Sequence, residues 1–341
     1  MFLNQTIYSV ANPTAVAAVD VNSDNKPDIV VANYGANTVS ILLNLGGGTF
    51  NVHSTYSVDN NPESIAVVDL NSDNKPDIVV GNLLASTISV LINAGSGNFN
   101  AETSYSVGTN PTSVAVADVN SDNKPDIVVT NYGANTINVL LNTGSGTFNT
   151  QNTYAVGIHP ESVAVGDVNN DNKSDIVVAN GGSSTVGVLL NTGNGIFNTQ
   201  TNYTVGSSPQ VVAVVDVNSD NKSDIIVVNV GSGSGTVGVL LNTGNGTFNA
   251  QTSYSVSNEP QALAVVDVNS DSKPDIVVAN YGSNNVGVLL NTGSGTFNAQ
   301  TTYTLGYAPQ SVVVVDVNSD NKPDIIVASE ISSIVSVLLH S

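Results

Sequence analysis

The 341-residue sequence contains no cysteine and no arginine, and its only cations besides three histidines are seven lysines. The absence of cysteine excludes disulfides, thiol catalysis and cysteine-ligated zinc. With 27 acidic residues the formal net charge is -20, so the chain lacks the basic face that would neutralise nucleic-acid or lipid phosphates. Apolar runs all fall short of the roughly 20 residues that a membrane helix needs. We therefore expect no nucleic-acid partner and no membrane insertion.

What the chain does contain is a repeat. The pattern DVNSDNKPD, first seen at residues 20–28, recurs so that all seven lysines lie at its seventh position. Its copies are 49 residues apart, except for one interval of 51, and begin at Asp20, Asp69, Asp118, Asp167, Asp216, Asp267 and Asp316. Three aspartates per copy account for 21 of the 27 acids. An internal repeat therefore organises the whole sequence.

Each repeat is predicted to form four short strands. In one copy, β-branched runs at residues 113–118, 126–131, 136–142 and 148–156 are separated by Asn- and Gly-rich turns, without helical periodicity. The first run is apolar on both faces and the last is polar, which indicates an inner and an outer strand. A four-stranded unit of this length is typical of a propeller blade. The sequence predicts an all-β, seven-bladed propeller of four-stranded antiparallel blades.

The two ends of the sequence complete one another. Only two strands follow the last Asp loop, and residues 2–10 (FLNQTIYSV) match residues 297–305 (FNAQTTYTL). Pairing the N-terminal strand with the last blade would close the ring and cover an exposed strand edge. We therefore predict a single domain over residues 1–341, in which residues 2–10 complete the last blade, and we expect a monomer.

The nine-residue loop carries the chemistry. Side-chain oxygens at positions 1, 3, 5 and 9, with the backbone carbonyl of position 7, form an oxygen cage that suits Ca²⁺ better than Mg²⁺. Each loop, its lysine included, carries a net charge of -2, which one Ca²⁺ would cancel. The lysine is expected to face solvent and to offer its carbonyl. Position 6 is Asn, or Ser272 in one copy, where the sharp turn calls for a left-handed backbone.

We predict about seven Ca²⁺, one per repeat. The predicted side-chain ligands are Asp20, Asn22, Asp24, Asp28, Asp69, Asn71, Asp73, Asp77, Asp118, Asn120, Asp122, Asp126, Asp167, Asn169, Asp171, Asp175, Asp216, Asn218, Asp220, Asp224, Asp267, Asn269, Asp271, Asp275, Asp316, Asn318, Asp320 and Asp324. The predicted carbonyl ligands are those of Lys26, Lys75, Lys124, Lys173, Lys222, Lys273 and Lys322. The alternative interpretation is a set of ordinary Asn- and Asp-rich hairpin turns.

In each repeat a segment similar to DVNSDNKPDIVVANYG is followed by one similar to VSVLLNTGSGTFN. This pattern resembles the FG-GAP or VCBS-type repeat of integrin alpha-chain propellers and seven-bladed fungal lectins. The resemblance covers essentially the whole sequence. It implies Ca²⁺ in the hairpin between the first and second strands, and an extracellular, secreted or cell-surface location with the secretion signal outside this sequence. Two departures from the repeat are the missing glycine at position 6 and FN in place of FG.

Variation among the copies is predicted to gather on the face opposite the Asp loops. Four tyrosines outside the repeated slot lie in the variable loops there: Tyr34, Tyr132, Tyr281 and Tyr307. Five acids and His159 lie there as well, and Glu63, Glu161 and Glu259 could approach one another across the ring mouth. Exposed tyrosines beside Asn and carboxylates suit a sugar or protein ligand. Drift of unconstrained polar turns is the alternative explanation.

The sequence therefore predicts a calcium-binding extracellular recognition module, for multivalent carbohydrate binding as a lectin or for cell adhesion. The expected partner is a glycan or an extracellular protein. Catalysis is not expected, because the three histidines occupy unrelated repeat positions and no activated nucleophile is indicated. The alternatives are a structural or spacer propeller of a larger protein and, less favoured, a glycan-active enzyme.

Overall fold

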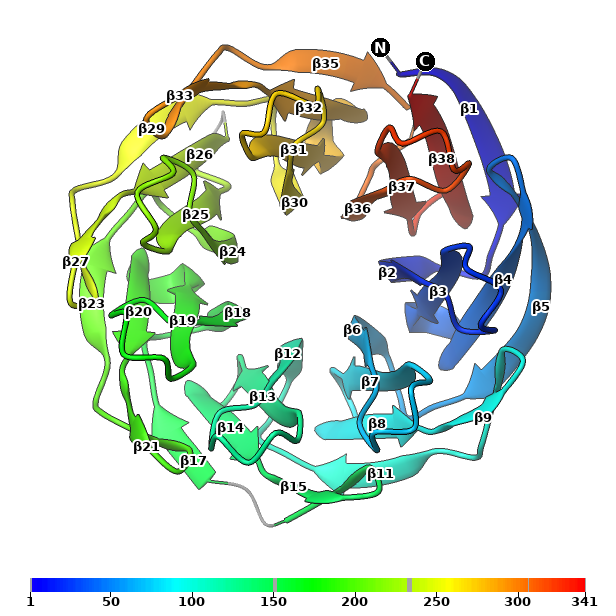
Figure 1. Ribbon diagram of the computed structural model, residues 1–341, viewed down its shortest axis with the longest axis horizontal. Coiled ribbons are helices and arrows are strands. Elements are labelled where there is room, and N and C mark those ends of the chain that lie inside the picture. Colours follow the sequence, from blue (N-terminus) through cyan, green and yellow to red (C-terminus); the bar gives the residue numbers. More distant parts are fainter. Residues whose placement is uncertain (1, 150–151, 232–234, 306, 341) are drawn as a thin grey trace.

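The computed structural model describes residues 2–149, 152–231, 235–305 and 307–340. Seven four-stranded antiparallel sheets stand around a central opening, as predicted from the repeats (Figure 1). The predicted domain bounds include Met1 and Ser341, which lie outside the described residues. Within those residues, no helix has the length and apolar character needed to cross a membrane.

The strands of each blade follow one another from the central opening outward. Blade 1 consists of β2 (Pro13–Val19), β3 (Asp28–Asn33), β4 (Thr38–Gly46) and β5 (Thr49–Ser57). Blade 2 consists of β6 (Pro62–Val68), β7 (Asp77–Asn82), β8 (Thr87–Leu91) and β11 (Thr103–Ser106). Blade 3 consists of β12 (Pro111–Ala117), β13 (Asp126–Asn131), β14 (Thr136–Leu140) and β17 (Asn152–Ala155). Blade 4 consists of β18 (Pro160–Gly166), β19 (Asp175–Asn180), β20 (Thr185–Leu189) and β23 (Thr201–Thr204).

The remaining blades have the same plan. Blade 5 consists of β24 (Pro209–Val215), β25 (Asp224–Asn229), β26 (Thr236–Leu240) and β29 (Thr252–Ser255). Blade 6 consists of β30 (Pro260–Val266), β31 (Asp275–Asn280), β32 (Asn285–Leu289) and β35 (Thr301–Thr304). Blade 7 consists of β36 (Ser311–Val315), β37 (Asp324–Ser329), β38 (Ile334–His340) and β1 (Phe2–Ser9).

In blades 2 to 6 a small two-stranded ladder precedes the outer strand, whereas β5 of blade 1 is continuous. These ladders are β9 (Asn93–Gly95) with β10 (Asn98–Phe99), β15 (Asn142–Gly144) with β16 (Thr147–Phe148), β21 (Asn191–Gly193) with β22 (Ile196–Phe197), β27 (Asn242–Gly244) with β28 (Thr247–Phe248), and β33 (Asn291–Gly293) with β34 (Thr296–Phe297). Within the described parts of the chain, three short 3-10 turns follow second strands: η1 (Tyr34–Ala36), η2 (Gly181–Ser183) and η3 (Tyr281–Ser283).

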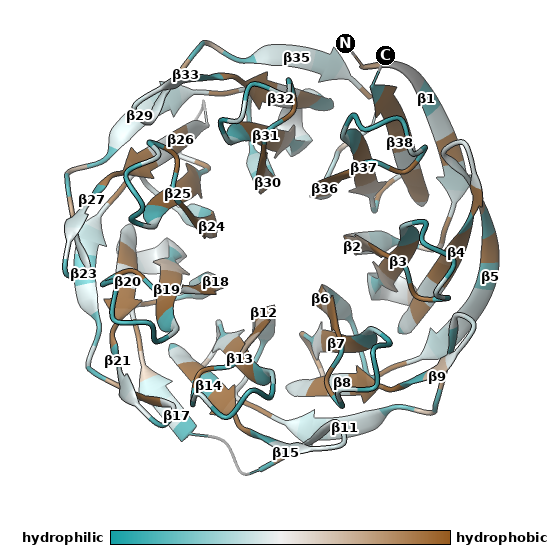
Figure 2. Ribbon diagram, in the orientation of Figure 1, coloured by the Kyte–Doolittle hydropathy of each residue, from teal (hydrophilic) through white to brown (hydrophobic). Residues whose placement is uncertain are grey.

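Burial explains the order of strands within a blade. Every residue of each second strand, such as β3, is buried, because neighbouring blades cover both of its faces. The outer strands are polar and largely exposed. In Figure 2, β11, β29 and β35 are pale, whereas the inner strands are mostly brown, the colour of hydrophobic residues. Polar side chains suit a strand whose outer face meets water. The apolar-inner and polar-outer pattern read from the sequence is therefore confirmed.

The hydrophobic core is divided among the interfaces between blades. Each of seven buried clusters draws its side chains from two adjacent blades. Tyrosines of the outer strands meet phenylalanines of a neighbouring blade edge to face, with ring centroids 5.2 to 5.7 Å apart. Such contacts add to the energy of burial and account for the seven tyrosines that share one repeat slot.

The N-terminal strand closes the ring. β1 pairs antiparallel with β38, and the two chain ends lie side by side (Figure 1). Phe2 packs edge to face on Tyr303 of blade 6, while Tyr8 packs on Phe50 of blade 1. β1 therefore bridges the blades on either side of the closure, and it covers the strand edge that β38 would otherwise expose.

The loops form two faces. The loop face carries the Asp loops and the turns that follow the third strands, and these turns touch: Gly97 donates its N–H to the carbonyl of Val21 at 3.2 Å. The connection face carries the links between blades and the turns between second and third strands. There the backbone N–H of Tyr34 donates to the carbonyl of Asn12, and that of Tyr132 donates to the carbonyl of Asn110, each at 2.9 Å. The predicted separation of loops onto two faces is therefore observed.

Candidate functional sites on the two faces

In each Asp loop the position-1 aspartate organises the turn. Asp20 Oδ1 accepts the N–H groups of Asn22, Ser23 and Asp24 at 2.7 to 3.2 Å, and Oδ2 accepts that of Asn25 at 2.6 Å. Asn25 has the left-handed backbone expected at position 6, with φ of 64°. Ser23 at position 4 is also left-handed, with φ of 65°, which the repeat pattern did not indicate. The loop therefore folds around its own backbone N–H groups.

The position-5 aspartate differs from expectation. Its Oδ2 pairs with the lysine ammonium in six loops, at 2.9 to 3.4 Å, whereas we expected that lysine to offer only its carbonyl. In the seventh loop, Asn318 Nδ2 donates to Asp320 Oδ2 at 3.2 Å. Both partners of each ion pair are partly exposed, so each pair contributes little to stability. Slight burial acts to raise the pKa of Asp122, but the hydrogen bonds and charge of Lys124 lower it overall.

The position-9 aspartate is enclosed. All seven of these carboxylates are 0% exposed, and each accepts two backbone N–H groups. Asp175 Oδ2 accepts the N–H of Val168 at 3.0 Å, and its Oδ1 accepts that of Asn191 at 2.7 Å. Burial raises the pKa of Asp175 to about 6, against the lowering effect of those two bonds. The carboxylate therefore ties the loop to the end of the third strand.

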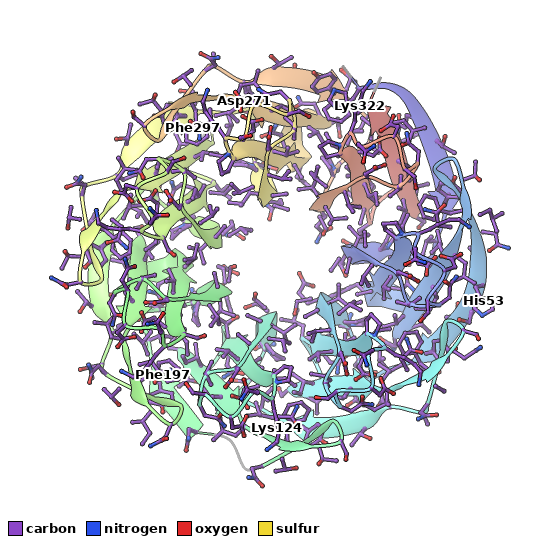
Figure 3. All side chains as sticks on the ribbon, viewed as in Figure 1. His53, Lys124, Phe197, Asp271, Phe297 and Lys322 are labelled. Carbon is purple, nitrogen blue, oxygen red and sulfur yellow. The ribbon has the colours of Figure 1, made fainter. Side chains whose placement is uncertain are left out.

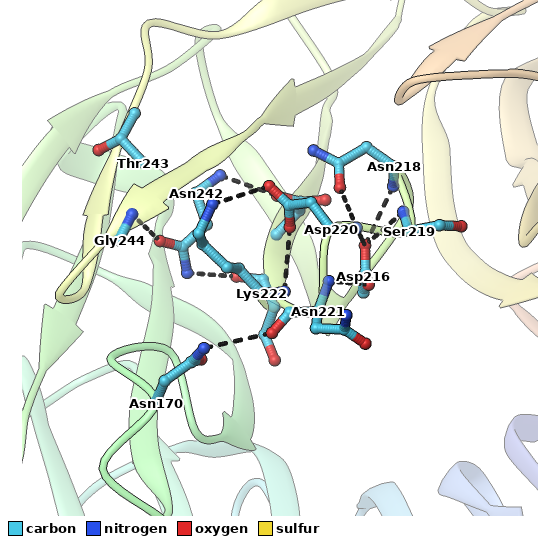
Figure 4. A network of polar contacts seen from close by, with 12 residues as sticks. Asn170, Asp216, Asn218, Ser219, Asp220, Asn221, Lys222, Asn242, Thr243 and Gly244 are labelled. Atoms are coloured by element: carbon cyan, nitrogen blue, oxygen red, sulfur yellow. Dashed lines mark hydrogen bonds and ion pairs between the residues drawn. The ribbon is translucent and has the colours of Figure 1, made fainter.

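An asparagine after the third strand extends this tie to the preceding blade. Asn242 Nδ2 donates to the carbonyl of Ser223 in its own Asp loop and to that of Val168 in the loop of blade 4, each at 2.8 Å. Figure 4 shows Asn242 beside Lys222 and the Asp216 turn. The same bond at Asn44 reaches Val317, across the ring closure, at 2.9 Å. These asparagines link neighbouring blades, a role that sequence reasoning missed because the partners lie about one and a half repeats apart.

The Asp loops contain the types of ligand atom that bind Ca²⁺, but only some of these atoms are placed where they could bind one ion together. Positions 1, 3 and 5 each offer side-chain oxygens, the donors that a hard cation prefers, although in this structure these oxygens accept backbone N–H groups and the lysine ammonium. Among the described residues, however, no group of three or more His, Cys, Asp or Glu side chains is placed to hold a metal ion. The reason is visible in blade 5, where Asp224 turns inward to the N–H groups of Val217 and Asn242. Positions 1, 3 and 5, with the carbonyl of position 7, are the remaining candidate ligands.

The connection face brings three of the four predicted tyrosines to equivalent places. Tyr34, Tyr132 and Tyr281 each follow a second strand and are partly buried, whereas Tyr307 lies in a link between blades and is 44% exposed. The ring of Tyr132 stacks on that of His159, with centroids 4.3 Å apart and planes 10° from parallel. His159 has a left-handed backbone, with φ of 51°, where the copies in blades 1 to 3 have Asn. The connection face therefore carries aromatic side chains at some blades and not at others.

At the centre of the connection face lies a pocket of about 310 Å³. Its rim consists of one residue from each blade, directly after the proline that precedes or begins the inner strand: Thr14, Glu63, Thr112, Glu161, Gln210, Gln261 and Gln310. In blades 1 to 6 this residue is the extra one at an irregularity in the pairing of the first two strands. Such bulges re-aim a side chain. Figure 3 shows that side chains of the inner strands project toward the central opening.

Two carboxyls of this rim have altered acidity. Burial raises the pKa of Glu63 to about 7, and the charges of Glu330 and Glu161 add to the rise. Burial likewise raises the pKa of Glu161 to about 7, against a hydrogen bond with Gln210. Burial, with the charges of Glu63 and Glu330, raises the pKa of Tyr34. Of the three acids that the sequence allowed to approach one another across the ring mouth, Glu63 and Glu161 line the pocket, while Glu259 lies beside Gly282 outside its lining.

Comparison with known proteins agrees with the fold. The model of the FG-GAP-like repeat matches residues 20–80, 69–129, 118–178, 167–227, 216–278 and 267–327. The chain belongs to the FG-GAP-like repeat family. No curated protein matches it significantly.

Solved propellers of several kinds are similar to this FG-GAP repeat protein in structure. BBS1N, solved in complex with ARL6DN, has 15% identity and a TM-score of 0.70, covering 100% of this chain and 96% of that chain. Virginiamycin B lyase from Staphylococcus aureus has 14% identity and a TM-score of 0.69, covering 99% of each chain. A lectin from Agrocybe aegerita that recognises non-reducing terminal N-acetylglucosamine has 21% identity and a TM-score of 0.61, covering 87% of this chain and 81% of that chain. At these identities the similarity establishes the fold alone.

Proposed function

We propose that this FG-GAP propeller is an extracellular recognition module that binds glycans through its connection face. The observation that carries the proposal is the contrast between the two faces. The seven Asp loops are nearly identical in sequence and hydrogen bonding, whereas the turns and links of the connection face differ from blade to blade and hold four tyrosines and His159. A face that differs from blade to blade is where a ligand finds distinct contacts.

Aromatic rings beside polar groups are suited to sugars. Sugars present C–H faces that stack on rings and hydroxyls that hydrogen-bond to amides and carboxylates. Tyr34, Tyr132 and Tyr281 offer such rings at three blades, so a branched or repeated glycan could engage several weak sites at once and gain avidity. The proposal assigns binding and no catalytic step. The lectin among the structural neighbours is consistent with this use of the fold.

A protein ligand is the second candidate. Leu84, Ile158 and Ile331, on loops of the connection face, are 53 to 70% exposed. Exposed apolar side chains are more useful to a protein partner than to a sugar. Adhesion through this surface would therefore use the apolar residues of blades 2, 4 and 7, and would not need the tyrosines of blades 1, 3 and 6.

We further propose that the Asp loops bind Ca²⁺ through positions 1, 3 and 5 and the position-7 carbonyl, and that this supports the scaffold and not the ligand contact. Ca²⁺ would neutralise the carboxylates of positions 1 and 5, and the ion pair between the position-5 aspartate and the lysine would be given up. The buried position-9 aspartate contributes by fixing the loop to the third strand.

A glycan array on the whole chain, with Ca²⁺ and with EDTA, tests the proposal. Tyr34→Ala, Tyr132→Ala and Tyr281→Ala together should abolish array binding while the melting temperature changes little. Asp24→Asn with Asp73→Asn is the matched pair on the loop face, and it should leave array binding intact in a folded protein. Binding lost through the loop pair but retained by the tyrosine variant would place the ligand on the loop face. Binding lost only after Leu84→Ser and Ile331→Ser, to a protein and not to glycans, would favour adhesion.

A further inference from the structure

Blades 4 and 5 contain a short motif that the proposed function does not use. Asn202-Tyr203-Thr204 lies in the outer strand β23, and Asn245-Gly246-Thr247 lies at the turn between β27 and β28. Asn-X-Ser/Thr, with any residue except proline at X, is the acceptor motif for N-linked glycans. Such a glycan is bulky and hydrophilic, so the asparagine that carries it has to lie on the surface of the folded chain. Figure 1 shows β23 and β27 on the outer side of the ring.

Both asparagines meet this requirement, because both are exposed. Asn202 Oδ1 accepts a hydrogen bond from Gln200 Nε2 at 2.9 Å, while Asn202 Nδ2, the atom to which a glycan is attached, has no partner among the described residues. Asn245 stands at the tip of its hairpin with a left-handed backbone, φ of 54°. Either side chain can therefore carry a large group without disturbing the core.

The other blades lack the motif at these two places. At the position of Asn245, blades 2, 3 and 6 have Ser. Blade 4 has Asn194 there, in the same exposed, left-handed turn, but Ile196 follows where blade 5 has Thr247. At the position of Asn202 the other blades have Thr, Ser or Ile. The repeats therefore supply matched turns and strands that differ from the two acceptors by single residues.

The connection face lacks an acceptor motif. In its turns and links Asn-X-Thr occurs twice, at Asn12 and Asn110, and X is proline in both cases, which excludes glycan transfer. The Asp loops of blades 4 and 5 contain the motif at Asn172 and Asn221, because Ser follows the lysine where the other loops have Pro. One more copy begins at Asn4, whose side chain lies outside the described ones. The described acceptors therefore lie on the loop face and the outer wall, away from the tyrosines assigned to glycan binding.

We propose that Asn202 and Asn245 carry N-linked glycans, an inference that rests on the proposed extracellular location. An oligosaccharyltransferase would transfer the sugar from a lipid diphosphate donor. The bond between sugar C1 and the diphosphate oxygen breaks, the bond between C1 and asparagine Nδ2 forms, Nδ2 gives one proton to a base of the transferase, and the lipid diphosphate leaves. These glycans would cover the loop face and outer wall of blades 4 and 5 and would leave the connection face open to its ligand.

The test uses the whole chain, secreted from cultured insect cells behind a cleavable signal peptide. Peptide N-glycosidase F in heavy-oxygen water converts each glycosylated asparagine into a labelled aspartate, which peptide mass spectrometry locates. We expect the label at positions 202 and 245. Asn202→Ser and Asn245→Ser should each remove one glycan, and both should fold because Ser occupies these positions in other blades. Thr204→Ala should also remove the glycan at Asn202, whereas Thr204→Ser should retain it.

Asn194 is the control for spontaneous deamidation, because it also precedes a glycine in an exposed turn. It should stay unlabelled, and Ile196→Thr should make it an acceptor. Unmodified Asn202 and Asn245 in the secreted, folded chain would overturn the proposal, as would a glycan retained in Thr204→Ala or equal labelling of Asn194 and Asn245.

The glycan array separates this result from the proposed function. Glycosylated and enzymatically deglycosylated chains should bind the array equally, because the attached glycans lie away from the connection face. An unmodified chain that still binds the array would refute the attached glycans alone and leave the proposed function standing. A glycosylated chain that loses array binding only while its glycans are attached would overturn the inference that they leave the connection face open.

Discussion

Glu63→Gln should stabilise this propeller at pH 8 and do little at pH 4. In the folded chain burial and neighbouring charges raise the pKa of Glu63 from 4.5 to about 7. The folded state therefore holds this proton more tightly than the unfolded state. Below pH 4.5 the carboxyl is neutral in both states and carries no penalty. Between pH 4.5 and 7 the penalty grows, and above pH 7 it is complete. The amide, which never ionises, avoids it.

The size of the effect follows from the pKa change. A rise from 4.5 to about 7 corresponds to an upper bound of about 3 kcal/mol at pH 8. Solvent at the pocket mouth screens part of this, so we expect about 1 to 2 kcal/mol in the free energy of unfolding. Glu161→Gln should act in the same direction, and the double variant should gain less than the sum because each carboxylate raises the energy of the other.

Urea unfolding at pH 4 and at pH 8 measures the difference between variant and parent, so that the titration of other groups cancels. Glu259→Gln serves as the control, because Glu259 lies outside the pocket lining. A gain of the same size at both pH values would mean that the amide packs better for reasons unrelated to charge. No gain at pH 8 would show that Glu63 is well solvated, and would refute the reasoning about the pocket.

Three further predictions concern the scaffold. Asp175→Asn should cost about 2 to 3 kcal/mol in EDTA, because one of two buried N–H groups loses its acceptor, whereas Asp171→Asn in the same loop should cost under about 0.5 kcal/mol; equal effects on urea midpoints would contradict the assignment of position 9. Deleting residues 2–10 exposes β38 and should cause aggregation or a clearly lower melting temperature, while a stable truncated monomer in light scattering would refute closure by β1. Calcium at about 1 mM should stabilise the chain by roughly 10 kcal/mol if seven sites each bind with a dissociation constant of order 0.1 mM; equal melting temperatures in Ca²⁺ and EDTA would dismiss the calcium proposal.

The architecture could be predicted from the sequence because it is written in local patterns repeated seven times. The Asp loop marks each first hairpin, the runs such as DIVVAN mark each buried second strand, and the match of residues 2–10 to residues 297–305 marks the closure. None of these inferences requires knowledge of distant contacts. The two faces then follow from the antiparallel order of the strands.

The remaining features depend on contacts that no local pattern records. The repeat pattern groups Asp28 with its loop, but its partner Asn44 lies 16 residues away, and that bond turns the carboxylate inward. The pocket is harder to predict, because its rim combines single residues from seven repeats, aimed by irregularities in strand pairing. A signal was present in the sequence: the residue after the proline varies from Thr to Glu to Gln in copies that otherwise change little.

Hydrogen–deuterium exchange of the whole chain, with and without the array glycan that binds most tightly, tests most directly whether the connection face is the recognition surface. We predict slower exchange in the turns after the second strands, at residues 33–38, 131–136 and 280–285, with little change in the Asp loops. Slower exchange confined to loops such as residues 20–28 and 69–77, with the tyrosine turns unaffected, would contradict this assignment.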